Sequence, residues 1–280
     1  MKIRQSHPIL DRIKVVMLLL ALLLCLGRLA EFLDEKKEMT EMKEVKKSAS
    51  IEKFIRTALQ PVGSTMYIWG GGWNEADQAS GSAATQIGLS PQWESFAKEQ
   101  DENYDYKEHQ FERENGLDCS GYVGWVMYNT FETTDGQDGY VITSTEMAKD
   151  FSKRGFGEYI ENPTKILAGD IVSMNGHVWI SLGTCADGSV LLVHASPPGV
   201  SVCGTKLKEA EESVAVRLAT EYMFQNHFAW QEKYPNRTVP DTYLKGVSVM
   251  RWNGGTMADA EVIQSLSGEE LMELLQASAD

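Results

Sequence analysis

The chain has 280 residues, which is enough for one large domain or two small ones. Its hydrophobic fraction of 42% and charged fraction of 24% are near the averages of globular proteins and exclude global disorder. Lys and Arg number 26 against 40 Asp and Glu, and this net charge of −14 argues against nucleic acid as a partner. The four cysteines include no C-x-x-C pair, which argues against a disulfide scaffold or a structural zinc ribbon. We expect an acidic, folded protein with no metal ion and no other cofactor.

Residues 1–30 have the pattern of a secretory leader. Basic residues precede an uninterrupted apolar run of twelve residues, from Val15 to Leu26. This run is shorter than the roughly 20 residues that a bilayer span needs, so a cleaved signal peptide is one interpretation. The other is an uncleaved membrane anchor over residues 13–30, in which Lys14 reaches back to the interface. Both interpretations predict an extracytoplasmic protein, either secreted or anchored with its domain outside.

Composition divides the rest of the chain into a linker, a domain and a tail. Residues 31–50 are rich in acids and bases, and their apolar positions recur at helical spacing, which predicts a charged helical stalk. The folded domain is expected over residues 51–255 and an acidic tail over 256–280. Within the domain, the polar segment 74–114 carries ten acids against three bases.

Helical patterns dominate the first half of the domain. Apolar residues at helical spacing predict a helix over 51–59, which Pro61 and Gly63 end. Ser90 and Pro91 fit an N-cap and a first-turn proline of a helix that ends near Glu99. The further expected helices are a buried one over 122–131, one from a Thr143–Glu146 capping box to Phe151, and one over 206–229.

Strand patterns dominate the second half. Runs rich in β-branched residues occupy 170–174, 177–182 and 190–194, and turn signals at Asn175-Gly176 and Ala186-Asp187-Gly188 separate them. Residues 200–203 and 246–252 are candidates for two further strands. Helices first and strands later indicate an α+β fold, with N-terminal helices packed on a central antiparallel sheet of about five to six strands.

Cys119 has the surroundings of a nucleophile. It lies where a glycine-containing turn enters the expected buried helix, and the free N–H groups and dipole of a helix start favour a thiolate. Asp118 is placed to be the N-cap, so its charge is expected to be taken up by the amides of Ser120 and Gly121. A lone cysteine is more often a buried, inert residue. The position at the helix start therefore makes Cys119 the candidate nucleophile.

Two histidines lie at matching ends of one expected hairpin. His177 begins a strand directly after the Asn-Gly turn, and His194 ends the next strand. Pairing of these strands through the 183–189 turn is expected to bring both side chains to one end of the sheet. This arrangement predicts that His177 is a base for Cys119 and that His194 orients His177.

Five short blocks, in a fixed order, resemble the NlpC-type cell-wall cysteine peptidases. They are Tyr67-Ile68-Trp69-Gly70-Gly71, Asp118-Cys119-Ser120-Gly121-Tyr122, Ala168-Gly169-Asp170-Ile171-Val172, Gly176-His177-Val178 and Val193-His194-Ala195-Ser196. The resemblance covers about residues 51 to 206. It implies a compact papain-like domain that cleaves peptide bonds in peptidoglycan stem peptides, commonly beside D-glutamate and a diamino acid.

The resemblance also implies roles for single residues. By position, Cys119 is the nucleophile, His177 the base and His194 the third polar residue of the site. Tyr67 matches a tyrosine beside the family's active site. The expected partner is a peptidoglycan stem peptide, bound outside the cytoplasm.

Four more positions are expected to meet the substrate. Asp118 and Ser120 match family positions that contact the substrate or line the site. Trp73 and Trp179 lie near the ends of the motifs and are expected to line the substrate groove.

The chain departs from the family pattern between the Trp-Gly-Gly segment and the cysteine block, where the family has a shorter link. The inserted segment 74–114 is either a wall or lid beside the cleft or a solvated surface excursion. Cys185 and Cys203 form a disulfide bond or remain two free thiols.

Three functions remain open at this point. The first is a peptidoglycan endopeptidase, and the second is an envelope amidase or acyltransferase that uses the same cysteine and histidines. The third is a non-catalytic envelope scaffold. The intact set of Cys119, His177 and His194 favours an enzyme.

Overall fold

The structure is a computed structural model, and it describes residues 49–131, 139–207 and 212–277, with positions 17, 24, 26–29, 32, 33 and 36 of the N-terminal part. The chain divides into two compact units, Met1–Val45 and Lys46–Asp280, and the fold and the candidate site belong to the second. Most of the expected leader and stalk lies outside the described residues. Among the residues that are described, no helix is both long enough and apolar enough to cross a membrane.

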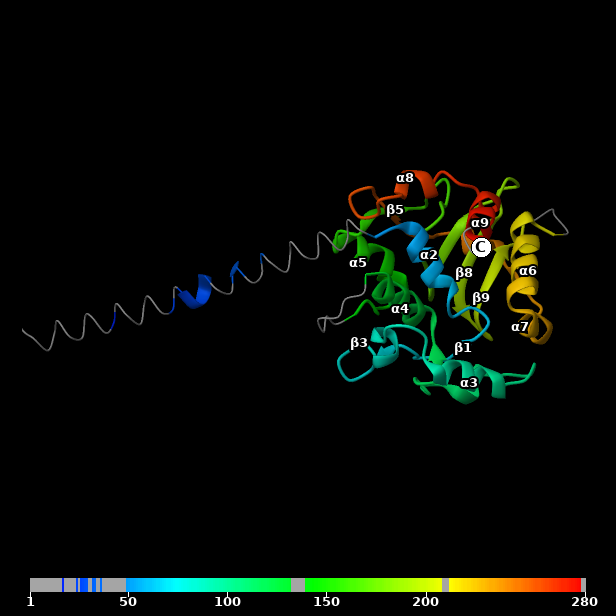
Figure 1. Cartoon of the computed structure of the whole chain (residues 1–280), viewed down its shortest axis with the longest axis horizontal. Helices are drawn as coiled ribbons and strands as arrows, with labels where there is room; N and C mark the ends of the chain where they lie inside the picture. The colour runs from blue at the N-terminus through cyan, green and yellow to red at the C-terminus, as the bar shows by residue number, and fades with distance from the viewer. Residues whose placement is uncertain are drawn as a thin grey trace, which may run out of the picture. The chain divides into compact units, whose positions relative to one another are not determined.

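Helices occur in the first half and in the second half of the folded unit's sequence (Figure 1). The sequence predicted the bounds of the first two, and the Ser50 hydroxyl caps the first by accepting a hydrogen bond from the Lys53 amide. The α-helices of the described part are α2 (Ile51–Leu59), α3 (Pro91–Glu99), α4 (Cys119–Phe131), α5 (Met147–Lys153), α6 (Val214–Asn226), α7 (Phe228–Lys233), α8 (Ala260–Ile263) and α9 (Gly268–Ala277).

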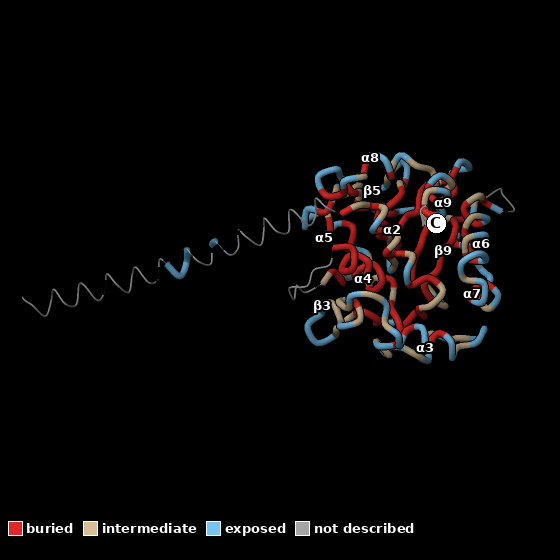
Figure 2. The backbone as a smooth tube through the Cα atoms, viewed as in Figure 1, coloured by how far each residue is buried: buried red, intermediate tan, exposed pale blue. Residues whose placement is uncertain are grey.

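The helix α4 lies in the centre of the unit. Apolar residues occupy nearly every position, so no face is suited to water, and all but Ser120 are buried. Figure 2 shows this burial, in contrast to the exposed outer surfaces of α6 and α7. The prediction of a buried helix is confirmed, and the helix begins at Cys119, three residues before the expected start at 122.

Two helix predictions were wrong in their boundaries. The Thr143 side chain makes no capping bond, so residues Ser144–Glu146 form a 3-10 turn, η3, and α5 begins only at Met147. The expected helix over 206–229 is two helices, because His227 has non-helical dihedral angles and its ring packs over the backbone of Gly63. Part of that range, residues 208–211, lies outside the described residues.

The main sheet is curled and mostly antiparallel. Within the described residues it contains nine strands, in the order β4-β1-β9-β8-β7-β6-β11-β5, with β10 beside β9. The bounds are β1 (Met66–Tyr67), β4 (Gly116–Leu117), β5 (Gly157–Glu161), β6 (Ile171–Met174), β7 (His177–Thr184), β8 (Val190–Ser196), β9 (Gly199–Thr205), β10 (Thr238–Val239) and β11 (Ser248–Trp252).

The α+β class is as predicted, but the strand count was too low. The five expected strands correspond to β6, β7, β8, β9 and β11. Three of the additional strands have only two residues each, which is too short for a hydrophobic alternation to be visible in the sequence. The fourth, β5, alternates half-buried and exposed residues at the edge of the sheet.

The two faces of the sheet have different coverings. Side chains such as Val178, Ile180 and Val193 form the main core with α2, α4, α5 and α6. Side chains that point to the opposite face of the sheet, including Trp179, Leu192 and Cys203, form a second core. This second core is closed by Val239 and Val247 and by Tyr243 of the 3-10 turn η4 (Asp241–Leu244). A segment that follows the helices α6 and α7 therefore covers the back of the sheet.

A buried ion pair joins the neighbouring strands β6 and β11. The carboxylate of Asp170, which has no exposed surface, accepts hydrogen bonds from Arg251 Nε at 3.0 Å and Nη2 at 2.6 Å. The indole of Trp252 donates to the Gly169 carbonyl at 2.8 Å and lies in the core. The Ala-Gly-Asp block thus has a structural role, because it ties β6 to β11.

The inserted segment 74–114 is folded onto the domain. It contains the end of a short hairpin formed by β2 (Trp73–Asn74) and β3 (Ala79–Ser80), then the 3-10 turn η1 (Ser82–Thr85), the helix α3 and the 3-10 turn η2 (Tyr106–His109). Trp93 of α3 is buried and packs edge-on against Trp125 of α4, with ring centroids 5.9 Å apart. Part of the segment is therefore packed on the core, while residues 75–78 and 101–103 are exposed.

Candidate active site

The turn before α4 brings Cys119 beside the Tyr67 segment. Strand β4 pairs in parallel with β1, so that Tyr67 lies opposite Leu117, two residues before the cysteine. The Asp118 amide donates to the Gly71 carbonyl at 3.0 Å. A Cβ on Gly121 would lie 2.0 Å from the Gly71 oxygen, so only glycine allows this approach. The two blocks are therefore held together by backbone contacts.

Asp118 caps the helix, as the sequence predicted. One carboxylate oxygen accepts hydrogen bonds from the Gly121 amide and the Ser120 hydroxyl, both at 2.7 Å. The other accepts one from the Gly70 amide at 3.2 Å. Burial raises the pKa of Asp118 above its usual value, although these hydrogen bonds act in the opposite direction. The side chains of Asp118 and Ser120 are thus engaged in the turn itself.

The Cys119 thiol is buried and protonated at neutral pH. Burial raises its pKa to about 12, and the nearby Asp118 carboxylate adds to the increase. Backbone amides of Val178, Ser120 and Cys119 act in the opposite direction because they face the sulfur. The sequence predicted a thiolate from the helix start alone. In the resting protein desolvation opposes these amides and favours the neutral thiol over the thiolate that the helix start predicted.

The two histidines meet at one end of the sheet. His177 Nε2 lies 3.0 Å from His194 Nδ1, and the two rings are inclined by 75°. The pairing of β7 with β8 begins only at Ile180 and Val193, so residues 177–179 are hydrogen-bonded to β6 alone. The strands thus separate where the amide of Val178, the residue after His177, faces the sulfur of Cys119.

Both histidines are neutral at neutral pH. Burial lowers the pKa of His177 to about 4. The pKa of His194 is lowered well below its usual value by burial, by His177 and by the Arg237 guanidinium. Since His177 Nε2 is joined to His194, its Nδ1 is the nitrogen that remains to take a proton from a reacting group.

Tyr67 forms a wall of the site together with the inserted segment. Its ring packs edge-on against Tyr106, with centroids 5.4 Å apart, and its carbonyl accepts a hydrogen bond from the Tyr104 hydroxyl at 2.7 Å. Burial raises the pKa of Tyr67 above its usual value, and the nearby Cys119 and Asp118 add to the increase. The phenol is therefore a neutral hydrogen-bond donor close to the sulfur.

Tyr243 is a site residue that the sequence did not reveal. Its ring lies 5.4 Å from the His177 ring and 5.8 Å from the His194 ring, measured between centroids. Its hydroxyl is hydrogen-bonded to Ser196, and burial followed by Cys203 and Cys119 raises its pKa to about 12. It lies beyond the residues that resemble the peptidase family, and no local pattern distinguishes it.

The two tryptophans expected at the groove differ in their surroundings. Trp179 has no exposed surface and packs in the second core beneath Tyr243, at a centroid distance of 6.3 Å. It cannot line an open groove, so this prediction was wrong. Trp73 is half-buried in the β2–β3 hairpin and follows Gly72, which packs against Gly121 of the cysteine turn, so its place beside the substrate stays a prediction.

The other two cysteines of the described residues, Cys185 and Cys203, are free thiols. Cys185 belongs to the main core and approaches the start of α9, whereas Cys203 belongs to the second core on the opposite face of the sheet. The sheet separates them, so the disulfide alternative was wrong. In the described part of the chain, no three His, Cys, Asp or Glu side chains are grouped as metal ligands.

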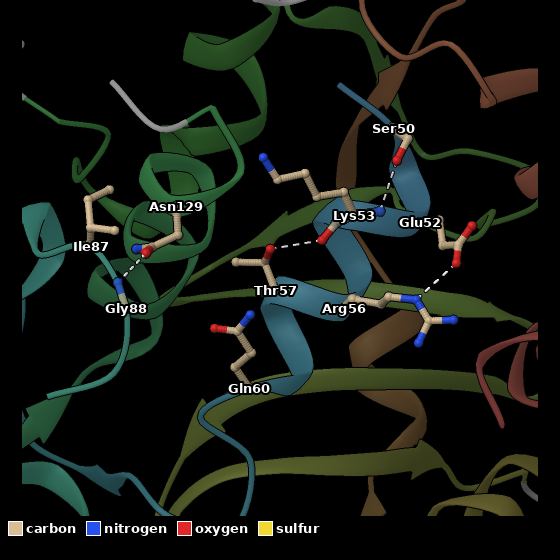
Figure 3. Close-up of a pocket in the computed structure, with 9 residues that line it drawn as sticks. All are labelled: Ser50, Glu52, Lys53, Arg56, Thr57, Gln60, Ile87, Gly88 and Asn129. Atoms are coloured by element: carbon tan, nitrogen blue, oxygen red, sulfur yellow. Dashed lines mark hydrogen bonds and ion pairs between the residues drawn. The ribbon is translucent and has the colours of Figure 1, made fainter. Parts of the chain in front are cut away.

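A surface pocket of about 480 Å³ lies elsewhere, against the outer side of α2 (Figure 3). Its charged side chains include Glu52 and Arg56, which are paired with each other at 2.9 Å. Asn129 lines it too, and its side-chain oxygen accepts a hydrogen bond from the Gly88 amide at 2.6 Å. None of the sequence candidates lines this pocket, so it does not extend the candidate active site.

Comparisons of the chain with protein-family models, with curated proteins and with solved structures found no match.

Proposed function

We propose that the protein is a cysteine endopeptidase of the NlpC type, with a papain-like fold, that hydrolyses peptidoglycan stem peptides. The observation that carries this proposal is that Cys119 lies against strand β7 at the residue after His177, and that His177 is hydrogen-bonded to His194. The sulfur faces the amide of Val178, next to His177, whose Nε2 lies 3.0 Å from His194. A nucleophile, a base and a group that orients the base are the minimum for acyl transfer through a covalent intermediate.

The neutral resting state suggests a general-base mechanism. As Cys119 Sγ attacks the carbonyl carbon of the scissile bond, its proton moves to His177 Nδ1. The imidazolium that forms is held by the neutral His194 at Nε2. This route needs no preformed thiolate, in keeping with a thiol pKa of about 12 and an imidazole pKa of about 4.

The tetrahedral intermediate then collapses. Its oxyanion is stabilised by backbone amides at the start of α4, including those of Cys119 and Ser120, which already face the sulfur. His177 gives its proton to the leaving amine, and the C–N bond breaks to leave a thioester on Cys119. Water, activated by the neutral His177, hydrolyses the thioester and restores the thiol.

The choice of stem peptides as substrate rests on the resemblance in sequence. The blocks around Cys119, His177 and His194 occur in the order found in the NlpC-type peptidases, and the leader pattern suits an extracytoplasmic enzyme. The fold is compatible with this proposal, because a helix that starts with the cysteine packs on the strands that carry the histidines. The wall made by Tyr67 and Tyr106 is suited to an extended peptide beside the sulfur.

Digestion of purified muropeptides tests the proposed function. The full chain is incubated with them, and the new amino and carboxyl termini are identified by mass spectrometry. We expect wild-type protein and the Cys185→Ala control to release the same peptides and Cys119→Ala to release none. Release by Cys119→Ala would contradict the assignment of the nucleophile. Cleavage of the amide bond to the sugar, or acyl exchange without hydrolysis, would indicate an amidase or acyltransferase instead.

A further inference from the structure

Tyr243 lies against both rings of the histidine pair. Its ring centroid is 5.4 Å from that of His177 and 5.8 Å from that of His194, and the interplanar angles are 62° and 74°. The two imidazole rings are themselves 5.2 Å apart and inclined by 75°. Each of the three rings therefore meets the other two edge to face, at centroid distances typical of aromatic pairs.

The ring of Tyr243 also packs on a buried residue of the second core. Trp179, which has no exposed surface, lies at a centroid distance of 6.3 Å with its ring inclined by 33°. Trp179 and His177 are two residues apart on β7, so their side chains point to the same face of the sheet. Tyr243 therefore rests on the sheet and on the histidine pair at once.

The backbone that carries Tyr243 is tied to the strand beside His194. Strand β10 pairs in parallel with β9, and in β9 Ser201 lies opposite His194. The turn η4 follows β10 directly, and the Tyr243 amide donates a hydrogen bond to the Pro240 carbonyl at 3.1 Å. The position of the tyrosine is thus set from the same strand that positions His194.

The ring of His177 has little other support. His177 is the first residue of β7 and pairs with Met174 of β6, whereas β8 joins the strand only from Ile180 onward. Its Nε2 is hydrogen-bonded to His194 Nδ1 at 3.0 Å. Because the χ2 torsion of a histidine has only weak preferences of its own, contacts with neighbours must fix the direction of the ring nitrogens. Tyr243 supplies such a contact.

We propose that Tyr243 is a positioning residue whose ring holds His177 in the orientation that binds Nε2 to His194 and leaves Nδ1 for the cysteine. The inference rests on the proposed function, because it concerns the base of that reaction. The contact is made by the ring of the tyrosine and not by its hydroxyl, so phenylalanine is expected to replace it. The chain beyond residue 206 thereby contributes to the geometry of the base.

NMR of the full chain labelled with ¹⁵N-histidine tests this role in the absence of substrate. The ring-nitrogen shifts at pH 7 report which nitrogen of each neutral histidine carries the proton, and His177→Gln identifies the signals of His177. In the wild type we expect one tautomer of His177, with its proton on Nε2, from which it is donated to His194. In Tyr243→Leu we expect shifts averaged between the two tautomers, because the ring is free to turn.

Two further variants separate the ring from the rest of the side chain. Tyr243→Phe retains the ring and is expected to show the wild-type shifts of His177. Phe228→Leu, which removes an exposed ring on α7, is the matched control and is expected to leave them unchanged. A single tautomer of His177 in folded Tyr243→Leu would overturn the proposal, as would averaged shifts in Tyr243→Phe. If Tyr243→Leu does not fold, Tyr243→Met, whose unbranched side chain adapts to the space above Trp179, takes its place with the same expected result.

Steady-state kinetics with muropeptides gives a second readout. Tyr243→Leu is expected to lower kcat by about 10- to 100-fold with little change in KM, because the base is misaligned, and Tyr243→Phe is expected to restore most of kcat. An unchanged kcat in Tyr243→Leu would overturn the proposal. The two proposals can fail separately: a wild type that cleaves no muropeptide but shows the expected tautomers would refute the peptidase function and leave the positioning of His177 by Tyr243 intact.

Discussion

At Cys119, two opposing effects decide the state of the thiol. The start of α4 supplies backbone amides that favour a negative sulfur, whereas burial and the Asp118 carboxylate favour the neutral form. Burial has the larger effect, so the pKa of the thiol is about 12. The reactive state is therefore expected to form only when substrate excludes water and His177 accepts the proton.

The first prediction concerns the reactivity of the free thiol. We expect iodoacetamide to alkylate Cys119 at pH 7 at least about tenfold more slowly than an ordinary exposed thiol, and the rate to rise steadily with pH, because only the thiolate reacts. Peptide mapping of the alkylated protein measures the rate at each pH, and free cysteine in the same solution is the reference. A fast rate that is already constant between pH 5 and 8 would reveal a preformed thiolate–imidazolium pair.

The second prediction separates the two histidines. His177→Gln removes the base and is expected to lower kcat for muropeptides by about 10²–10⁴-fold. His194→Asn retains a polar partner for His177 Nε2 and is expected to lower kcat far less, by about tenfold. Steady-state rates of both variants, with the remote His227→Gln as control, measure the difference. Equal losses in the two variants would argue that His194 does more than orient His177.

Among the elements, the first turn of α4 shows how closely the site is built. The Gly71 carbonyl lies where a side chain on residue 121 would be. The Tyr67 segment and the cysteine turn are therefore in direct backbone contact. This contact explains why the Asp-Cys-Ser-Gly block requires glycine at 121, and the Gly116 carbonyl, 2.5 Å from a Cβ on Gly71, explains the glycine at 71. Because of this contact, a substitution that shifts the turn would move Cys119 and Tyr67 together.

The third prediction follows from that contact. Gly121→Ala places a methyl group 2.0 Å from the Gly71 oxygen, and we expect the free energy of unfolding to fall by about 1–3 kcal/mol, with loss of activity. Urea denaturation measures the change. Gly254→Ala is the matched control, since a methyl group there meets no other atom within 4 Å. Equal stability of the two variants would show that the backbone contact does not persist in solution.

The fourth prediction concerns the inserted segment as a wall. Tyr106→Ala removes the ring that packs on Tyr67, a contact of about 0.5–1.5 kcal/mol, and is expected to raise KM for muropeptides several-fold with little change in kcat. Phe228→Ala, an exposed aromatic residue on α7, is the control and should leave KM unchanged. If Tyr106→Ala changes neither parameter, the segment does not meet the substrate beside Tyr67.

Long elements and ordered motifs were predictable from the sequence, whereas short pairings were not. The helix α2 has one apolar stripe and clear end signals, and α4 is apolar throughout, so both were predicted. The hairpin of β7 and β8 was predicted from its turn residues, and with it the meeting of His177 and His194. Strands of two residues, such as β1 and β10, depend on contacts far along the chain and leave no local pattern.

The candidate site shows the same limit. Cys119 and the histidines were recognisable because their motifs are local, but Tyr243 reaches the site only through the closure of the second core. Trp179 was misjudged for a related reason. Its neighbour His177 lies at the end of β7, whereas Trp179, two residues further along the strand, is covered by Tyr243.

For the molecule as a whole, the buried neutral histidines predict a loss of stability in acid. A histidine whose pKa is lower in the folded than in the unfolded chain is protonated first in the unfolded chain, so stability falls as the pH drops below about 6.5. For His177 the loss levels off below its folded pKa of about 4, and each histidine contributes up to about 1.4 kcal/mol per pH unit in this window.

Comparison with a variant isolates this fifth prediction. The raised pKa values of the buried Asp118 and Asp170 act in the opposite direction, because the folded chain takes up their protons first. The double variant His177→Gln/His194→Gln retains these carboxyls and lacks the histidines. Its free energy of unfolding, from urea titrations between pH 7 and 4, is expected to fall less steeply than that of the wild type. Parallel curves would mean that the histidines are not buried as neutral rings.

The central claim is that Cys119, activated by His177, attacks the carbonyl of a stem peptide. A stem peptide that carries an electrophilic vinyl sulfone in place of the scissile carbonyl tests it most directly, with the adduct mapped by mass spectrometry of the digested protein. We expect a single adduct on Cys119 in the wild type, competition by intact muropeptides, and a rate reduced at least about a hundredfold in His177→Gln. Labelling of Cys185 or Cys203 instead, or equal labelling with and without His177, would contradict the account.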